Sequence, residues 1–386
     1  MTGLRQGRRI GAQIAATVLA ASVLGAGLAQ ASGKESLDAL IAAAKKEPKE
    51  IDGRLTLAMI PVVKKATELF NKRFGLDKTF KIIEGRDNTF TTKMMATLDI
   101  GGRPKLAFYA TNGGDMLSFV TGGYAEKIKD WKAVLAEINP RVKSGKVDAN
   151  AVSPKGYEGY AIAHSNRLKG VGYNKKLISL KDLPRTYAEM ASPKYKGQYA
   201  IEPWTSHWEA LGHSYYPDRL DPFLKIIDAI GANTYVVSRS HQLVPRMALG
   251  EIKFMTLNAE VMAAFIADNP GAPLDYYFMD DLVLVETTLV FIPPKSPAPA
   301  SAALWAMFLS HPDVQALRDA KAPNIMYGEK NSDLEMKARL KGKKVWDWQT
   351  DKQAMAYWKW INAKEQKKFR GAIKQAIRQK RKKRRR

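Results

Sequence analysis

The sequence predicts an α/β protein of two lobes, each a mostly parallel sheet flanked by helices, with the second lobe inserted into the first. The chain has 386 residues, a length that suggests two or more domains. Apolar strand-like runs alternate with helix-like runs over residues 53–123 and again over 158–258. Such alternation is typical of a parallel sheet covered by helices. Cysteine is absent, which excludes disulfides, thiolate zinc sites and a cysteine nucleophile.

The first lobe begins with a helix at 36–46, for which Ser36 is a plausible N-cap. The pattern then predicts strands at 53–61, 78–85 and 105–110, and helices at 62–75, 91–102 and 113–123. In such sheets ligands bind beyond the carboxyl ends of the strands.

The second block has strands and helices of its own. Strands are predicted at 158–165, 168–174, 197–204 and 252–258, and helices at 184–191, 206–216, 222–232 and 241–251. Two further strands at 274–279 and 282–292 and a helix at 298–310 follow. The pattern places the two crossings between lobes near Ser165 and Pro270, with a cleft between the lobes.

Residues 1–31 have the features of a cleaved signal peptide. A cationic start precedes a mostly apolar run, and Ala29-Gln30-Ala31 has the small-x-small pattern of a cleavage site. Gln13 weakens the alternative of a membrane anchor. We expect export to the periplasm. Arg8-Arg9 leaves both general and twin-arginine export open.

The net charge of +24 is concentrated at the C-terminal end. From Lys364 onward the chain has thirteen lysine or arginine residues and one glutamate. Residues 362–386 are therefore expected to form a basic tail, and blocks of like charge are usually solvated. Contact with an anionic membrane surface is an equally open role. Because the protein is expected to be exported, we expect no nucleic-acid partner.

Several motifs in family order carry a resemblance. Tyr173-Asn174 ends a strand, Leu183-Pro184 precedes a short helix, and Ser192–Gly197 reads Ser-Pro-Lys-Tyr-Lys-Gly. Weaker matches lie at 248–254, 271–276, 297–315 and 345–361. Over roughly residues 34–361 the chain resembles the type 2 extracellular solute-binding proteins of ABC importers, family 1, and especially the group related to ferric-iron-binding proteins.

This resemblance implies a two-lobed periplasmic-binding-protein fold with a ligand cleft at the hinge. It implies a monomer without catalytic activity or cofactor, which captures a small anionic or organic solute and delivers it to an ABC permease in the inner membrane. The expected limits are 34–164 and 271–361 for the first lobe and 165–270 for the second. The sequence does not identify the solute.

The candidate ligand contacts lie at strand ends and helix starts facing this cleft. A helix start presents unpaired N–H groups that favour anions. Trp204 adds rigid contact area, although simple helix capping by Thr205 or Ser206 explains the same residues. The candidates are Met59, Asn88, Thr89, Asn112, Gly113, Ser165, Asn166, Trp204, Thr205, Ser206, His207, Asn258 and Glu260.

Two alternatives stay open. Relatives that hold ferric iron have paired tyrosines after the Gly-Glu strand, where this chain reads Thr256–Glu260. Tyr215-Tyr216 and Tyr276-Tyr277 lie in other segments and are expected to be packing residues, so no metal site is predicted. A two-lobe enzyme is the second alternative, but no Gly-x-Ser-x-Gly, phosphate-loop or His-Glu-x-x-His motif occurs.

Overall fold

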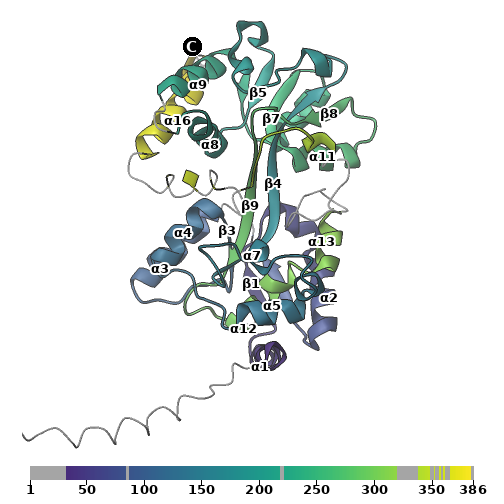
Figure 1. Cartoon of the computed structure of the whole chain (residues 1–386), viewed down its shortest axis with the longest axis vertical. Helices are drawn as coiled ribbons and strands as arrows, with labels where there is room; N and C mark the ends of the chain where they lie inside the picture. Colours follow the sequence, from purple (N-terminus) through teal and green to yellow (C-terminus); the bar gives the residue numbers. More distant parts are fainter. Residues whose placement is uncertain are drawn as a thin grey trace, which may run out of the picture.

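The computed structural model has two lobes joined by two long strands (Figure 1). It describes residues 32–83, 87–217, 221–319, 338–347, 352, 356, 357, 360 and 366–383. The predicted signal peptide lies outside the described residues. The joining strands are β4 (Ala161–Asn174) and β9 (Val283–Phe291), and they run antiparallel to each other from one lobe into the other.

The first lobe contains most of the elements before β4 and two helices after β9. Its strands are β1 (Glu50–Gly53), β2 (Thr79–Ile82) and β3 (Tyr109–Asn112), and its 3-10 helix is η1 (Leu57–Val62). Its helices are α1 (Gly33–Lys45), α2 (Val63–Phe74), α3 (Asp87–Asp99), α4 (Gly113–Thr121), α5 (Trp131–Ile138), α6 (Pro140–Lys143), α7 (Ala149–Val152), α12 (Pro299–Phe308) and α13 (Pro312–Asp319).

The second lobe is built between β4 and β9 and is completed by the C-terminal segments. Three short 3-10 turns follow β4: η2 (Leu180–Asp182), η3 (Glu189–Ala191) and η4 (Pro193–Tyr195). The strands are β5 (Tyr199–Ile201), β6 (Val236–Val237), β7 (Phe254–Asn258), β8 (Leu274–Tyr277) and β10 (Val345–Asp347). The helices are α8 (Ser206–Tyr215), α9 (Asp221–Asn233), α10 (Ser240–Ala248), α11 (Ala259–Asp268) and α16 (Gln366–Lys383).

One large sheet runs through both lobes in the strand order β10-β9-β4-β7-β5-β6. The pairs β5–β7, β5–β6 and β10–β9 are parallel, whereas β4 pairs antiparallel with β7, β8 and β9. β3 pairs antiparallel with β9, and β1 and β2 form a separate parallel pair. The predicted α/β class with helix-flanked sheets is confirmed, in the form of a mixed sheet.

The pairing of β8 shows where the chain returns to the first lobe. Residues 274–277 pair with 171–174 of β4, in the second lobe, and the chain passes back along β9. A return at 271 would place β8 in the first lobe. β10 at 345–347 also belongs to the second lobe, although the predicted first lobe extends to 361. The remaining predicted lobe limits stay a prediction.

Three predicted elements differ locally from the structure. The run 53–61 is not a strand, because β1 ends at Gly53 and a 3-10 helix containing Pro61 follows; proline has no N–H for a strand ladder. The strands predicted at 158–165 and 168–174 are one strand, β4, with a register shift between Ala163 and Ser165. The N-cap of α1 is Ser32 and not Ser36, since Ser32 and Glu35 form a capping box.

The basic C-terminal segment is also more ordered than predicted. Residues 366–383 form helix α16, which lies against α8 and α9 of the second lobe (Figure 1). The apolar stripe of Phe369, Ile373 and Ile377 is buried in that contact. Gly231 allows the close approach, because a Cβ there would lie 2.7 Å from the Ala376 carbonyl oxygen. The predicted solvated tail is therefore wrong for residues 366–383, which form a helix packed on the second lobe.

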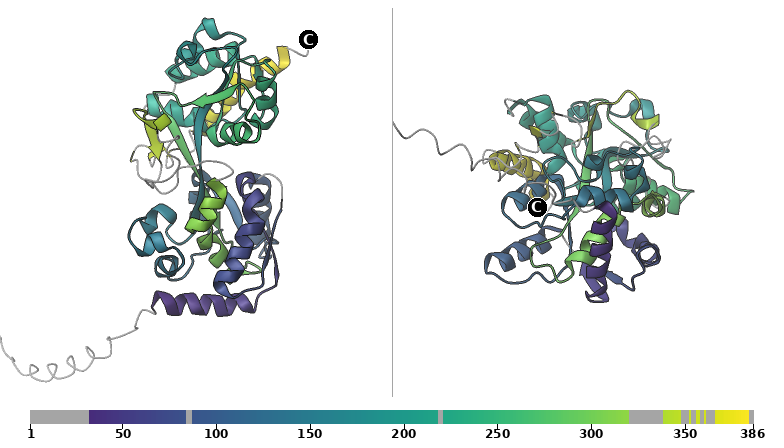
Figure 2. Two further views of the ribbon diagram at one scale, coloured as in Figure 1. Left: turned by 90° about the vertical axis from the view of Figure 1, so that its right-hand side faces the viewer. Right: turned by 60° about the horizontal axis from the view of Figure 1, so that its bottom comes forward.

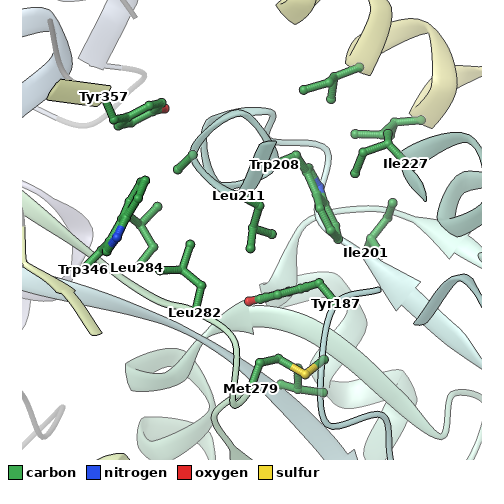
Figure 3. Close-up of a cluster of buried hydrophobic side chains, with 14 of the residues drawn as sticks. Tyr187, Ile201, Trp208, Leu211, Ile227, Met279, Leu282, Leu284, Trp346 and Tyr357 are labelled. Carbon is green, nitrogen blue, oxygen red and sulfur yellow. The ribbon is translucent and has the colours of Figure 1, made fainter. Parts of the chain in front are cut away.

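A core cluster follows β4 and β9 from the first lobe into the second, where α8 supplies its centre. Figure 3 shows Trp208 of α8 standing between Tyr187, Ile201 and Ile227. Burying this aromatic ring contributes on the order of 3 kcal/mol. The first lobe has its own core around Phe70 and Trp305, and Figure 2 shows α1 at the far end of this lobe.

Candidate functional site

A row of polar and charged side chains crosses the large sheet where β4 and β9 join the lobes. Arg167 of β4 pairs with Glu286 of β9, and Lys169 of β4 pairs with Asn258 of β7. Residues 167 and 169 are two apart, so these pairs share one face of the sheet. Glu202 follows directly after β5, the neighbour of β7.

The charged groups of this row lie around one ammonium group, and all of them except the half-buried Arg167 are buried. The Lys169 side chain is 5% exposed, and its Nζ lies 4.0 Å from Glu202 Oε2 and 3.8 Å from Glu286 Oε2. Both distances exceed the usual length of an N–H···O hydrogen bond. Glu260, in the first turn of α11, and His207, in the first turn of α8, complete the group, and both are buried. We call Arg167, Lys169, Glu202, His207, Asn258, Glu260 and Glu286 the strand-end cluster.

Several buried polar atoms of the strand-end cluster have no hydrogen-bond partner among the described residues. They are Glu202 Oε2, Asn258 Oδ1, Glu260 Oε2 and both ring nitrogens of His207. Buried polar atoms in proteins are nearly always hydrogen-bonded, and each unpaired one costs about 1–3 kcal/mol. Such a concentration is typical of a site that receives a polar ligand or ordered water.

Burial also changes the protonation of the cluster. Loss of hydration raises the pKa of the Glu260 carboxyl to about 7, and Glu202 adds to this while Arg167 and Lys169 oppose it. Burial and the charge of Lys169 hold the pKa of His207 well below its usual value, so its imidazole is neutral at pH 7. Glu260 is therefore the group that changes charge near neutral pH.

The segment Trp204–His207 is divided between the surface and the interior. Trp204 is 45% exposed, and the guanidinium carbon of Arg239 lies 5.8 Å from its ring centroid. Thr205 is the N-cap of α8 but makes no side-chain capping bond, so the predicted capping role is wrong for Thr205. Ser206 is the first residue of α8, and its side chain is not described. The His207 ring contacts the Trp208 ring at an interplanar angle of 40°, with ring centroids 4.1 Å apart.

Two candidates on β4 lie beside the strand-end cluster. Ser165 and Asn166 are 3% and 4% exposed, and Thr287 Oγ1 donates a 2.7 Å hydrogen bond to Asn166 Oδ1. Ser165 shares the face of Arg167 and Lys169, whereas Asn166 lies on the opposite face beside Thr287. The structure thus brings Ser165, His207, Asn258 and Glu260 to the same part of the sheet.

The first-lobe candidates are placed differently. Met59 of η1 is fully buried in the core of the first lobe, whereas Thr89 is exposed on α3. The Asn112 side chain caps α4 through Asp115 N, and the Gly113 carbonyl accepts a 2.8 Å hydrogen bond from Tyr157. Asn88 belongs to α3, and its side chain is not described. Their role as ligand contacts stays a prediction.

The tyrosine pairs are packing residues. Tyr276 and Tyr277 are 5% and 6% exposed, and Tyr277 donates a 2.6 Å hydrogen bond to the Pro184 carbonyl. Burial keeps the pKa of Tyr277 well above its usual value, which disfavours the tyrosinate form. Tyr215 and Tyr216 are half-buried beside the core. In the part of the chain that the structure describes, no three histidine, aspartate or glutamate side chains are arranged to hold a metal ion.

A cavity of about 470 Å³ lies in the first lobe, away from the strand-end cluster. It is lined by α1, the loop 126–130 and α12, including Leu40, Ile128 and Ala303. None of the candidate ligand residues lines it. Its lining combines apolar side chains with polar ones such as Ser36 and Asp130, and Ser36 Oγ donates a 2.9 Å hydrogen bond to Asp130 Oδ2.

Sequence reasoning missed Lys169 and Glu202 as site residues. Lys169 interrupts the apolar strand 168–174, and Glu202 ends the strand run of β5. A charged residue within a strand that is otherwise buried is the signal that would have found them, because such a charge must be paired.

Solved structures share this arrangement of lobes and strands. The iron-bound HitA from Pseudomonas aeruginosa superposes with a TM-score of 0.64 at 15% identity, covering 82% of this chain and 100% of that one. A substrate binding protein of an ABC transporter from Agrobacterium tumefaciens reaches 0.66 at 14% identity, covering 86% and 96%. The spermidine/putrescine protein PotD from Streptococcus pneumoniae reaches 0.58 at 12% identity, covering 84% and 100%.

The chain has the fold of these two-lobed binding proteins. At such low identity the likeness concerns the fold alone. No family model and no curated protein matches the sequence. Among the described residues, no helix combines the length and the apolar character needed to cross a bilayer.

Proposed function

We propose that this chain is the exported substrate-binding component of an ABC import system, and that it holds a small solute at the strand-end cluster. The observation that carries the proposal is the set of buried, unpaired polar atoms at the end of β5 and β7 and the start of α8 and α11, beside Lys169 of the connecting strand β4. Helix starts and strand ends meet there, as expected for a ligand site in an α/β fold. The fold of the solved ABC-transporter binding proteins supports the same function.

The proposed mechanism is closure of the lobes about β4 and β9. Both strands continue through the junction, so small changes in their backbone angles would rotate one lobe against the other. A solute held by residues of both lobes shifts the open–closed equilibrium by its preference for the closed form. Ser165 and the strand-end cluster would hold the solute, Asn166 would support β4 from the opposite face, and Asn112 or Thr89 would contact the solute from the first lobe.

The remaining features of the proposal concern place and partners. We propose removal of residues 1–31 during export, a periplasmic location, a monomeric state and delivery of the solute to an inner-membrane permease. We also propose that the basic C-terminal segment contacts an anionic membrane surface. No catalytic step is proposed, and nucleic acid is not a proposed partner.

Ferric iron is the second candidate solute, because HitA of the same fold is described as iron-bound. In this chain the buried, hydrogen-bonded Tyr277 opposes direct tyrosinate coordination. Addition of ferric iron would give a visible charge-transfer band only if tyrosinates were ligands.

A thermal-shift screen tests the proposed function on the mature chain. The panel contains carboxylates, phosphorylated solutes, amines and ferric chelates. A solute that binds the folded state at one hundred times its Kd stabilises it by about 2.7 kcal/mol. We expect at least one class to raise the Tm, with the effect reduced in Glu202→Gln. No shift from any class would contradict the proposal.

A further inference from the structure

Apart from the two ring nitrogens of His207, the unpaired atoms of the strand-end cluster share one chemical character. Glu202 Oε2, Asn258 Oδ1 and Glu260 Oε2 are hydrogen-bond acceptors, and each belongs to a residue around Lys169. Lys169 does not satisfy Glu202, since its Nζ is 4.0 Å away. A ligand that fits this site must therefore bring hydrogen-bond donors. A carboxylate or phosphate would bring only more acceptors.

The charges of the cluster lead to the same ligand class. Three carboxylates, Glu202, Glu260 and Glu286, surround two cations, Arg167 and Lys169. With all five groups ionised the buried site lacks one positive charge. An anionic solute would increase this imbalance, and burial makes uncompensated charge costly. The excess of carboxylates over cations therefore argues against the anionic solute that the helix starts predict.

We propose that the solute carries a protonated amino group, which Glu202, Asn258 and Glu260 receive through three N–H···O hydrogen bonds. An ammonium group has three donors and no acceptor, which matches the three unpaired oxygens. The positive charge of the ammonium group would balance the third carboxylate of the cluster. This inference rests on the proposed function and assigns the chemical class of its solute.

A proton on Glu260 takes the place of this charge when the site is empty. The carboxyl is surrounded by Arg167 and Lys169 of β4, Glu202 after β5 and the neutral His207 of α8, with Glu286 of β9 beyond Lys169. Burial raises its pKa to about 7, so the empty site is largely protonated below pH 7. An ammonium displaces that proton. Amine affinity should therefore weaken by up to about tenfold per pH unit below 7 and level off above it.

Three four-carbon probes that differ only in their end groups test the proposal: 1,4-diaminobutane, 4-aminobutanoate and succinate. The mature chain is titrated with each at pH 8 and pH 6 by calorimetry and thermal shift. We expect binding of one or both amine-bearing probes, stronger at pH 8, and no binding of succinate. Binding of succinate without binding of either amine would overturn the proposal.

Variants separate the site from general effects of charge. Glu202→Gln should weaken amine binding at least about tenfold, because a charge-assisted hydrogen bond is lost. Glu260→Gln should also weaken binding and abolish its pH dependence. Glu251→Gln is the matched control, since Glu251 is exposed and pairs with Arg246. Equal affinity in all three variants would overturn the proposal.

Asn258→Asp keeps the inference testable if the glutamine variants unfold. It adds a carboxylate of similar shape and should strengthen amine binding; weaker binding would count against the proposal.

The thermal-shift panel separates this inference from the proposed function. If the only panel members that bind lack an amino group, the inference fails and the function stands. If no member binds, the proposed function fails and the inference fails with it.

Discussion

His164 lies in β4 directly at the register shift between Ala163 and Ser165, where the strand enters the junction of the lobes. It is fully buried, and neither ring nitrogen has a hydrogen-bond partner among the described residues. Burial, together with the charges of Arg318 and Arg167, lowers the pKa of its imidazole to about 3. The folded protein therefore keeps His164 neutral, whereas the unfolded chain protonates it below pH 6.5.

This difference predicts a loss of stability in mild acid. Below pH 6.5 the unfolded state binds one more proton at His164 than the folded state, so the free energy of unfolding falls by about 1.4 kcal/mol per pH unit. Urea unfolding of wild type and His164→Phe at pH 7.5 and 5.0 measures the effect. The variant should lose less stability than wild type between these pH values.

His207 and Glu260 stay in both proteins, so the comparison isolates His164. His207 acts in the same direction as His164. Glu260 acts in the opposite direction, because its raised pKa stabilises the folded state as pH falls through 7. Equal losses of stability in wild type and variant would show that His164 is not a buried neutral histidine.

At the scale of elements, α16 is held by a buried carboxylate of α8. Arg370 Nε and Nη2 donate hydrogen bonds of 2.9 and 3.0 Å to the two oxygens of Glu209, which is fully buried. Glu209 lies in the first turn of α8, two residues after the cluster residue His207. The C-terminal helix is thus joined to the helix that begins at the proposed solute site.

Arg370→Met should destabilise the protein because it leaves Glu209 buried without its cationic partner. The expected cost is about 3 kcal/mol, at the low end for a buried pair, since Arg370 is 39% exposed. Chemical denaturation measures the change. The double variant Glu209→Gln, Arg370→Met should recover part of it, and Lys374→Met on the exposed side of α16 is the control. A single variant as stable as wild type would remove the proposed role of the pair.

The order of elements could largely be predicted from sequence, whereas their ends and partners could not. The helices near 206–216, 222–232 and 241–251 match α8, α9 and α10, because their apolar periodicity decides them locally. For the residues of α16 the sequence alone leaves a solvated tail and a tail on an anionic membrane surface equally open, because nine of these residues are lysine or arginine and none is acidic. Its helix is placed by tertiary contacts, the pairing with Glu209 and the close approach at Gly231.

The same limit applies to the site. The expectation that ligands bind where strands end and helices begin predicts His207, Asn258 and Glu260 as contacts from the sequence alone. Lys169 and Glu202 could not be found from strand ends, because only the pairing of β4, β5 and β7 brings them together. Met59 is a predicted contact that the structure places elsewhere. The segment around it is a 3-10 helix and not a strand, and the Met59 side chain is buried in the core.

At the scale of the whole molecule, the basic helix α16 is packed against the second lobe. This packing determines which of its side chains could contact a membrane. Because Phe369, Ile373 and Ile377 are buried against the lobe, they cannot insert into a bilayer while α16 stays docked. Any attraction to lipid would then be electrostatic and would fall steeply with salt.

Liposome co-sedimentation tests this membrane contact. The mature chain should bind vesicles that contain phosphatidylglycerol at low salt, release them at about 0.5 M salt, and ignore neutral phosphatidylcholine vesicles. Truncation before Lys364 should abolish binding. Because truncation also uncovers the surface beneath α16, multiple Lys→Gln substitutions in α16 are the second variant. Equal binding of the charge-depleted variant would contradict the proposal.

The central claim is that two lobes close on a solute held where β4 and β9 join them. Small-angle X-ray scattering of the mature chain, with and without the panel solute that raises the Tm most, tests it most directly. The account predicts a smaller radius of gyration with the solute in wild type and no change in Glu202→Gln at the same solute concentration. An unchanged radius in wild type, or equal compaction in the variant, would contradict it.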